Sequence, residues 1–340
     1  MARVSAVNAL TIPELVQYAL DTAGHPETIN LDYEAPSALI SGLAQVCRIS
    51  ADLLVKTDLR AQLPNVPAVF LPVTQQKVAS HPKLSNVSTP SCRSCLWDHE
   101  TRGTPPFWKV EWAINLVTRC PEHLLLLSPY CHHCMSSLLT VVAHPKDGGV
   151  VTRCAACFQA TAFQRHVDVA PGVSARTQLV SDLGKVLVSA CKGFDPDPMW
   201  LGPVDSSTFL SVICDLLWIF LEGNLDCGFP LIGLCAPASE TEMAALGRNI
   251  WSRPLYLLST RHREIVVAAI AVALLGSEVC RRYDLRDRLP VPVNQVDAYP
   301  FFWAFRSCMR DRLGDVPNTI MGWRPSLLRE RALRHLSRPG

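Results

Sequence analysis

The stretch that decides the fold carries four ligand pairs: Cys92-Arg-Ser-Cys95, Cys120-Pro-Glu-His123, Cys131-His-His-Cys134 and Cys154-Ala-Ala-Cys157. Two residues separate the ligands in each pair, so one tight turn can point both side chains at a single metal ion. Two such turns complete the tetrahedron that zinc prefers. The stretch therefore predicts two structural zinc ions as cofactors.

The spacing allows two ways of pairing these turns. In the sequential pairing, which we favour, one ion is bound by Cys92, Cys95, Cys120 and His123, and the other by Cys131, Cys134, Cys154 and Cys157. The interleaved alternative joins the first turn to the third and the second to the fourth. The 19 residues between the third and fourth turns match a known zinc spacing. Between Cys131 and Cys134, His132 and His133 are expected to lie outside the ligand set.

Two segments near the ligands have strand patterns. Residues 138–142 and 150–152 flank Asp147-Gly148-Gly149, a hairpin signal, so the second site is predicted to be a zinc ribbon. Upstream of Cys120, apolar residues alternate with others, which predicts a half-buried strand; these residues are Trp108, Val110, Trp112, Ile114 and Leu116.

The region before the ligands, residues 1–90, is predicted to be helical and to end in a proline-rich connector. Residues 36–47 and 50–56 indicate two helices joined by a tight turn, with Ser50 as the N-cap of the second. This pattern is typical of a helix-turn-helix, and Lys56 and Arg60 are its candidate contacts to nucleic acid. The alternative is two packed helices without a nucleic-acid role.

The region after the ligands, residues 161–340, is predicted to be a helical domain. One helix begins at Ser206 or Ser207, and Ser239 with Glu242 forms a capping box for another. Further helices are expected over 261–275 and 300–313. A basic tail ends the chain and could bind nucleic acid or a partner through Arg329, Arg331 and Arg334. A solvated surface helix is the alternative for this tail.

The fold class is thus mostly α with a small β zinc module at residues 91–160. The formal charge of the chain is +2 and falls to −1 when seven thiolates hold two zinc ions. Any contact to nucleic acid must then come from local patches. The apolar run 265–276 is shorter than the roughly 20 residues that cross a bilayer, and no export signal stands out. We expect a cytoplasmic protein without a membrane partner.

Nothing in the sequence indicates an active site. Two zinc ions with four protein ligands each leave no open coordination position for a substrate. We find no metalloprotease helix, phosphate-binding loop, nucleophile elbow or dinucleotide fingerprint. The chain is therefore expected not to be an enzyme, and a zinc hydrolase is the weaker class.

An ordered set of motifs resembles a known family. It runs Cys92-Arg-Ser-Cys-Leu96, Phe107-Trp-Lys-x-x-Trp112, Leu116-Val-Thr-Arg-Cys120-Pro-Glu-His123-x-x-x-Leu127 and Cys131-His-His-Cys134-x-x-x-Leu138. This order of aromatic, basic and ligand residues resembles the TniQ/TnsD family of transposition target-selection proteins, over about 65 residues. Arg93 stands where the family commonly has a proline.

The resemblance implies a non-enzymatic adaptor of a bacterial transposon. Such adaptors recognise target DNA or a CRISPR RNA-guided complex and recruit an AAA+ ATPase that licenses the transposase. The implied partners are that ATPase together with target DNA, a CRISPR effector complex, or both, and a homodimer is an open alternative. A second hypothesis is a stand-alone zinc-containing DNA-binding regulator without a transposase.

Overall fold

The computed structural model describes residues 18–19, 21–24, 37–71, 90–104, 106–136, 139–143, 150–154, 156–162, 174–197, 199–200, 203–221, 237–250, 255, 258–275, 282–283 and 285. The chain forms two compact units. Unit 1 comprises Met1–Pro64, Pro72–Ile114 and Leu125–Ala170, and unit 2 comprises Asn65–Leu71, Asn115–Leu124 and Pro171–Gly340. The fold is mostly helical with little strand, as predicted. The three-part division of the chain stays a prediction.

Unit 1 contains the helices α3 (Ser37–Cys47), α4 (Ala51–Val55) and α5 (Leu59–Gln62). Arg48 follows α3 with a φ of 54°, which turns the chain sharply. The Ser50 hydroxyl then accepts a hydrogen bond from the Leu53 amide and caps α4, as the sequence predicts. The helix pair is confirmed. A helix-turn-helix is not shown, because α4 has five residues and buries none of them.

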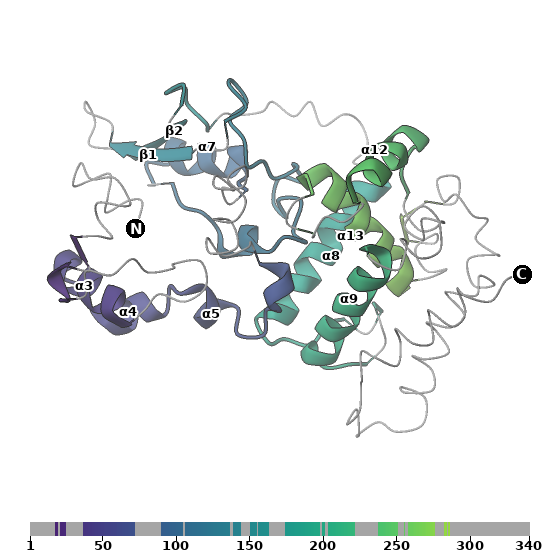
Figure 1. Cartoon of the computed structure of the whole chain (residues 1–340), viewed down its shortest axis with the longest axis horizontal. Coiled ribbons are helices and arrows are strands. Elements are labelled where there is room, and N and C mark those ends of the chain that lie inside the picture. Colours follow the sequence, from purple (N-terminus) through teal and green to yellow (C-terminus); the bar gives the residue numbers. More distant parts are fainter. Residues whose placement is uncertain are drawn as a thin grey trace, which may run out of the picture. The chain divides into compact units, whose positions relative to one another are not determined.

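The cysteine-rich part of unit 1 contains α7 (Arg93–Thr101), the 3-10 helix η3 (Val110–Ala113) and a two-stranded antiparallel sheet. Strand β1 (Leu139–Ala143) pairs with β2 (Val150–Cys154), from Leu139 opposite Cys154 to Ala143 opposite Val150. These strands confirm the predicted strand pair. Helix α7 packs against β2, as Figure 1 shows.

The strand predicted upstream of Cys120 is wrong. Residues 110–113 form η3, in which the Trp112 amide donates to the Lys109 carbonyl at 3.1 Å. The Ile114 amide likewise donates to the Glu111 carbonyl, so the backbone satisfies itself locally instead of along a neighbouring strand. The alternating apolar residues still supply core, since Trp112 and Ile114 are fully buried.

In the part of unit 2 that the structure describes, the short 3-10 helix η1 (Ala68–Phe70) is accompanied by the longer helices α8 (Ala175–Cys191), α9 (Ser206–Leu221), α12 (Glu240–Ile250) and α13 (Thr260–Leu275). Helices α8, α9 and α13 pack against one another, as seen in Figure 1. Every residue from Ile265 to Leu275 is buried, which confirms that the long apolar run is a core helix. Leu183, Leu187, Phe209 and Leu216 are fully buried in the same unit.

The caps of the unit 2 helices confirm one prediction and correct another. Ser239 and Glu242 form the predicted capping box at α12: the Ser239 amide donates to Glu242 Oε2 at 3.0 Å, and the Glu242 amide donates to Ser239 Oγ at 3.3 Å. At α9 the cap is Asp205, whose carboxylate accepts from the Thr208 amide at 2.8 Å. A carboxylate one residue earlier thus takes the role predicted for Ser206 or Ser207. The helix predicted over 300–313 lies outside the described residues.

Among the helices that the structure describes, none combines the length and the apolar character that a bilayer crossing needs.

Candidate metal centres

Among the described residues, two groups of four side chains each bring their ligand atoms to within 4.8 Å of one another. One group is Cys92, Cys95, Cys120 and His123, and the other is Cys131, Cys134, Cys154 and Cys157. Both groups follow the sequential pairing, not the interleaved one. Each can hold one metal ion. His132 and His133 belong to neither group, and their rings instead contact each other with centroids 3.8 Å apart.

The distances inside the groups fit tetrahedral coordination. With metal–sulfur bonds of about 2.3 Å, two sulfur ligands of a tetrahedron lie about 3.8 Å apart. In the second group Cys131 Sγ lies 3.7 Å from Cys157 Sγ, and Cys134 Sγ lies 3.6 Å from Cys154 Sγ. In the first group Cys120 Sγ lies 3.7 Å from His123 Nδ1. Sulfur and imidazole nitrogen are the donors that a soft tetrahedral ion such as zinc takes.

Three of the four turns share one backbone geometry. The residue after the second ligand has a positive φ, 56° at Leu124, 60° at Met135 and 57° at Phe158. Each of these residues donates its amide to the carbonyl of the first ligand, at 2.8 to 2.9 Å. A left-handed conformation costs a non-glycine residue about 1–2 kcal/mol, so three occurrences at equivalent positions indicate a shared constraint. That constraint is the convergence of two ligands on one point.

The remaining turn is the start of a helix. Cys92 is the N-cap of α7 and Cys95 lies in its first turn. Their spacing of three residues places them on one side of the helix end. The Arg93 guanidinium donates to the Tyr130 carbonyl at 2.7 Å and to Ser128 Oγ at 3.2 Å, which fixes this end of α7 within unit 1.

Two thiols of the second group, Cys154 and Cys157, have pKa values far apart. Burial raises the pKa of Cys154, but amide donors from Cys157 and Ala156 and the thiols of Cys134 and Cys131 outweigh it and lower that pKa to about 7. For Cys157 the Gln159 amide lowers the pKa, whereas desolvation and the neighbouring sulfurs raise it, to about 12 in sum. A bound cation favours the thiolate form of both residues and would offset the raised pKa of Cys157.

A carboxylate connects α7 to the hairpin that carries the second group. Glu100 Oε1 accepts both the Thr152 amide and the Thr152 hydroxyl, each at 2.7 Å. Thr152 is fully buried in β2, two residues before the ligand Cys154. The sequence contains no signal for this contact, because it joins residues 52 positions apart.

Within unit 2, the loop that carries Cys120 and His123 is held by two arginines. Arg119 Nε donates to Glu264 Oε1 at 2.7 Å, and Arg119 also donates to the Leu124 carbonyl. Arg263 donates to the carbonyl and the side chain of Asn115, at 3.1 and 2.8 Å. Because Glu264 is 3% exposed, its charge depends on this partner, and the loop is fixed to the N-terminal part of α13.

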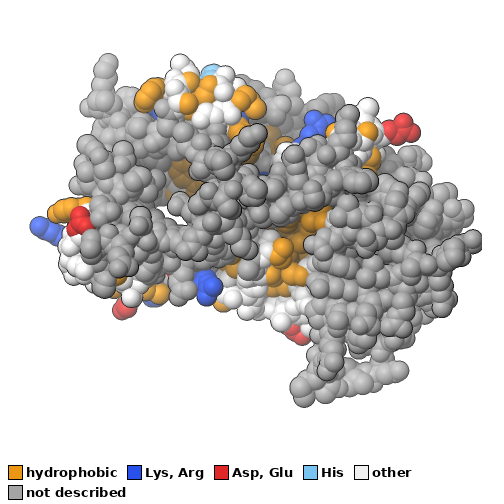
Figure 2. Space-filling view, in the orientation of Figure 1, with side chains coloured by type: hydrophobic (Ala, Val, Ile, Leu, Met, Phe, Trp, Pro, Cys, Tyr) orange, Lys and Arg blue, Asp and Glu red, His pale blue; other side chains and the backbone are white. Residues whose placement is uncertain are grey.

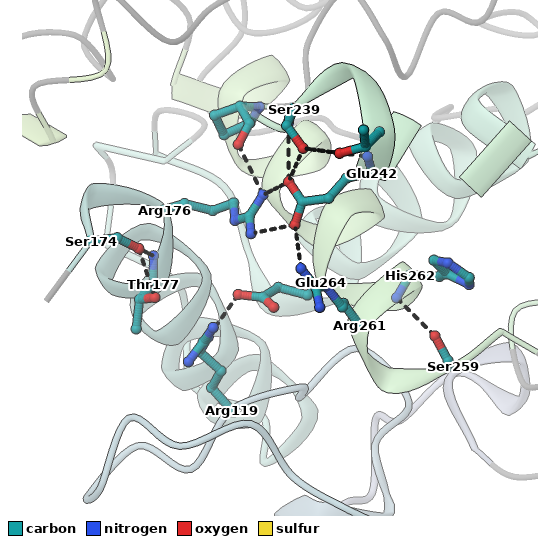
Figure 3. A network of polar contacts seen from close by, with 12 residues as sticks. Arg119, Ser174, Arg176, Thr177, Ser239, Glu242, Ser259, Arg261, His262 and Glu264 are labelled. Carbon is teal, nitrogen blue, oxygen red and sulfur yellow. Dashed lines mark hydrogen bonds and ion pairs between the residues drawn. The ribbon is translucent and has the colours of Figure 1, made fainter. Parts of the chain in front are cut away.

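The same part of unit 2 holds a second ionic contact, drawn in Figure 3. Arg176 of α8 donates two hydrogen bonds, of 2.9 and 3.0 Å, to the carboxylate of Glu242 in α12. Arg261 of α13 donates to the same carboxylate at 3.3 Å. The Arg176 hydrogen bonds, opposed by desolvation, lower the pKa of Glu242 to about 2. This network joins three helices of the unit.

Three exposed apolar side chains lie beside ligands of the second group. Tyr130, Met135 and Phe158 are 43%, 67% and 66% exposed, and each lies one residue from a ligand. Figure 2 shows orange hydrophobic side chains, a class that includes cysteine, at the surface where Figure 1 places α7 and β2. Cys134 itself is exposed, so solvent reaches this metal group.

The predicted nucleic-acid contacts lie apart from the metal groups in the sequence. Lys56 and Arg60 are exposed, at the C-cap of α4 and within α5. Arg329, Arg331 and Arg334 lie outside the described residues. Sequence reasoning missed Glu100, Arg93 and the Arg119–Glu264 pair, which hold the ligand segments in place.

Comparisons with known proteins do not identify the chain: no family model, no curated protein and no solved structure matches it.

Proposed function

We propose that this protein is a non-enzymatic target-selection adaptor of a bacterial transposon, with two structural zinc ions that shape its central module. The observation that carries the proposal is the grouping of eight ligands into two sets of four. A zinc ion with four protein ligands has no position for substrate or for an activated water. The metal then serves folding rather than reaction.

The order of motifs around these ligands supports the adaptor role. The resemblance to the TniQ/TnsD family rests on Phe107, Trp108, Lys109 and Trp112 as well as on the ligand pairs. Trp112 is fully buried next to the ligand segments in the sequence, as expected of a residue that supports a metal module. On this proposal the protein recognises target DNA or a CRISPR RNA-guided complex and recruits an AAA+ ATPase.

The test is to look for an AAA+ ATPase gene beside the gene of this chain and to use its product in a pull-down, with and without target DNA. We expect ATPase capture by the zinc-loaded protein and loss of capture when Cys131 and Cys134 are both changed to serine. Cys47→Ser is the matched control, because Cys47 is a cysteine outside both metal groups. DNA binding without any ATPase capture would favour the stand-alone regulator and overturn the adaptor role.

The basic tail is tested in the same assay. Changing Arg329, Arg331 and Arg334 to alanine should weaken binding of DNA or of the partner, because three positive charges are removed together. Zinc content should stay at two ions per chain. Unchanged binding of both DNA and ATPase would remove the tail from the proposed interface.

A further inference from the structure

The two metal groups differ in how far solvent reaches their sulfur atoms. In the first group Cys92, Cys95 and Cys120 are at most 1% exposed. In the second group Cys131 and Cys154 are equally buried, but Cys134 is exposed and Cys157 is partly exposed. A small oxidant in solution can therefore reach sulfur in the second group far more readily than in the first.

Each accessible sulfur of the second group also has a buried sulfur beside it. Cys134 Sγ lies 3.6 Å from Cys154 Sγ, and Cys157 Sγ lies 3.7 Å from Cys131 Sγ. A disulfide bond measures about 2.05 Å, so a closing movement of roughly 1.6 Å would join either pair. In the first group all three sulfurs are buried, and Cys120 Sγ lies 3.7 Å from His123 Nδ1.

We propose that the second group is a redox-labile zinc site, in which a peroxide oxidises Cys134 and Cys154 to a disulfide and the ion is released, while the first group keeps its ion. This inference rests on the zinc occupancy in the proposed function, and it adds regulation by an oxidant. Exposure selects Cys134 as the sulfur attacked, and proximity selects Cys154 as the sulfur that resolves the product.

The chemistry balances in two steps. The Cys134 thiolate attacks one oxygen of hydrogen peroxide, the O–O bond breaks, and a sulfenic acid and hydroxide form. The Cys154 thiolate then attacks the sulfenic sulfur, the S–O bond breaks, and the disulfide and a second hydroxide form. The two thiolates lose two electrons and the peroxide gains them. Zinc loses two of its four ligands and leaves.

The consequence falls on the hairpin. Cys134 precedes β1 and Cys154 ends β2, so the new disulfide would close the chain around both strands. The hairpin would keep a covalent closure after the ion is lost. Met135 and Phe158 are exposed and each follows a ligand of this group. Without the ion, the two turns that carry these side chains would no longer be held by the metal.

The experiment follows zinc release from the full-length protein. Zinc per chain is measured by elemental analysis, hydrogen peroxide is added, and free zinc is read with a chromogenic chelator. We expect two ions at the start and the release of one, with the second leaving at least about tenfold more slowly. Peptide mass mapping after alkylation should show the Cys134–Cys154 disulfide. Reductant and zinc should restore the starting content.

Two variants distinguish oxidation at the accessible Cys134 sulfur from a general effect of the oxidant on the protein. Cys134→His keeps a zinc-binding side chain and removes the attacked sulfur, so release should slow about tenfold and the disulfide should not form. Cys47→Ser should release zinc as the wild type does, since Cys47 is a partly exposed cysteine outside both groups. If Cys134→His does not hold two ions, the disulfide map of the wild type still decides.

The outcomes are distinguishable. Fewer than two zinc ions before oxidation would overturn the metal assignment in the proposed function and this inference with it. Two ions at the start that leave together, or neither leaving, would overturn only the redox inference. A disulfide between Cys92 and Cys95, with the second group intact, would also contradict it.

Discussion

The ion pair between Arg176 and Glu242 should carry a measurable share of the stability of unit 2. Glu242 is 14% exposed, and its carboxylate accepts hydrogen bonds from Arg176, Ser239 and Arg261. These contacts, the Arg176 hydrogen bonds foremost, lower its pKa from 4.5 to about 2. At 1.36 kcal/mol for each pH unit, that decrease corresponds to roughly 3 kcal/mol.

The sign of the pH dependence follows from the depressed pKa. The unfolded chain binds the Glu242 proton more tightly than the folded one, so the stabilisation is complete above about pH 5. It is lost as the pH falls toward 2. In Glu242→Gln this contribution is absent, and we expect a loss of about 2–3 kcal/mol at pH 7 and a smaller loss on acidification.

The assay is urea unfolding followed by the helical circular dichroism signal, at pH 7 and at steps from pH 5 to 3. Protonation of the zinc ligands at low pH affects wild type and variant alike. The quantity compared at each pH is therefore the difference between their free energies of unfolding. A double-mutant cycle with Arg176→Met should give a coupling of about 1–3 kcal/mol. Lys185→Met is the control, because the Lys185–Asp182 pair is 49% and 29% exposed and should contribute under about 1 kcal/mol. Equal pH profiles for wild type and Glu242→Gln would refute the reasoning.

Three further predictions concern unit 1 and α8. Removing metal with a chelator should unfold the β1–β2 hairpin, because a structural zinc supplies roughly 10–16 kcal/mol; a hairpin that stays folded by amide exchange would contradict this. Glu100→Ala should destabilise the same hairpin by about 1–3 kcal/mol, since it leaves the buried amide and hydroxyl of Thr152 without their acceptor; an unchanged rate of zinc loss would count against it. Gly42→Ala should lower the free energy of unfolding, measured by thermal unfolding, by about 1–3 kcal/mol, because the new methyl group would overlap the backbone carbonyl of Ala19. Gly184→Ala in α8 is the contrasting change: its methyl group meets no atom within 4 Å, and it should raise the free energy of unfolding by up to about 1 kcal/mol.

Local signals in the sequence predicted part of this fold. The capping box of Ser239 and Glu242, the Ser50 cap and the apolar run of α13 depend on neighbours in the chain, and the structure has all three. The ligand spacing likewise predicted the residues of both metal groups, because two ligands three positions apart constrain one turn.

The elements that the sequence did not predict depend on contacts between residues far apart in the chain. Helix α8 was not expected, because Gly184 and several valines lower its intrinsic helix propensity, and its packing against α9 and α13 stabilises it instead. The segment ending at Ile114 alternates like a strand but finds no partner strand in the part described. A short apolar run can fit both the strand period of about two residues and the helical period of about 3.6, and tertiary packing decides which structure forms.

The left-handed residues after the ligands have a consequence for how such a module can diversify. Metal binding depends on the sulfur atoms and on a backbone hydrogen bond at Met135 and Phe158, whereas the side chains at these two positions lie mostly in solvent. Mutation can therefore change the chemistry that the turn tips present without disturbing the ion beneath them. A scaffold of this kind separates what must be inherited unchanged from what is free to acquire a new partner.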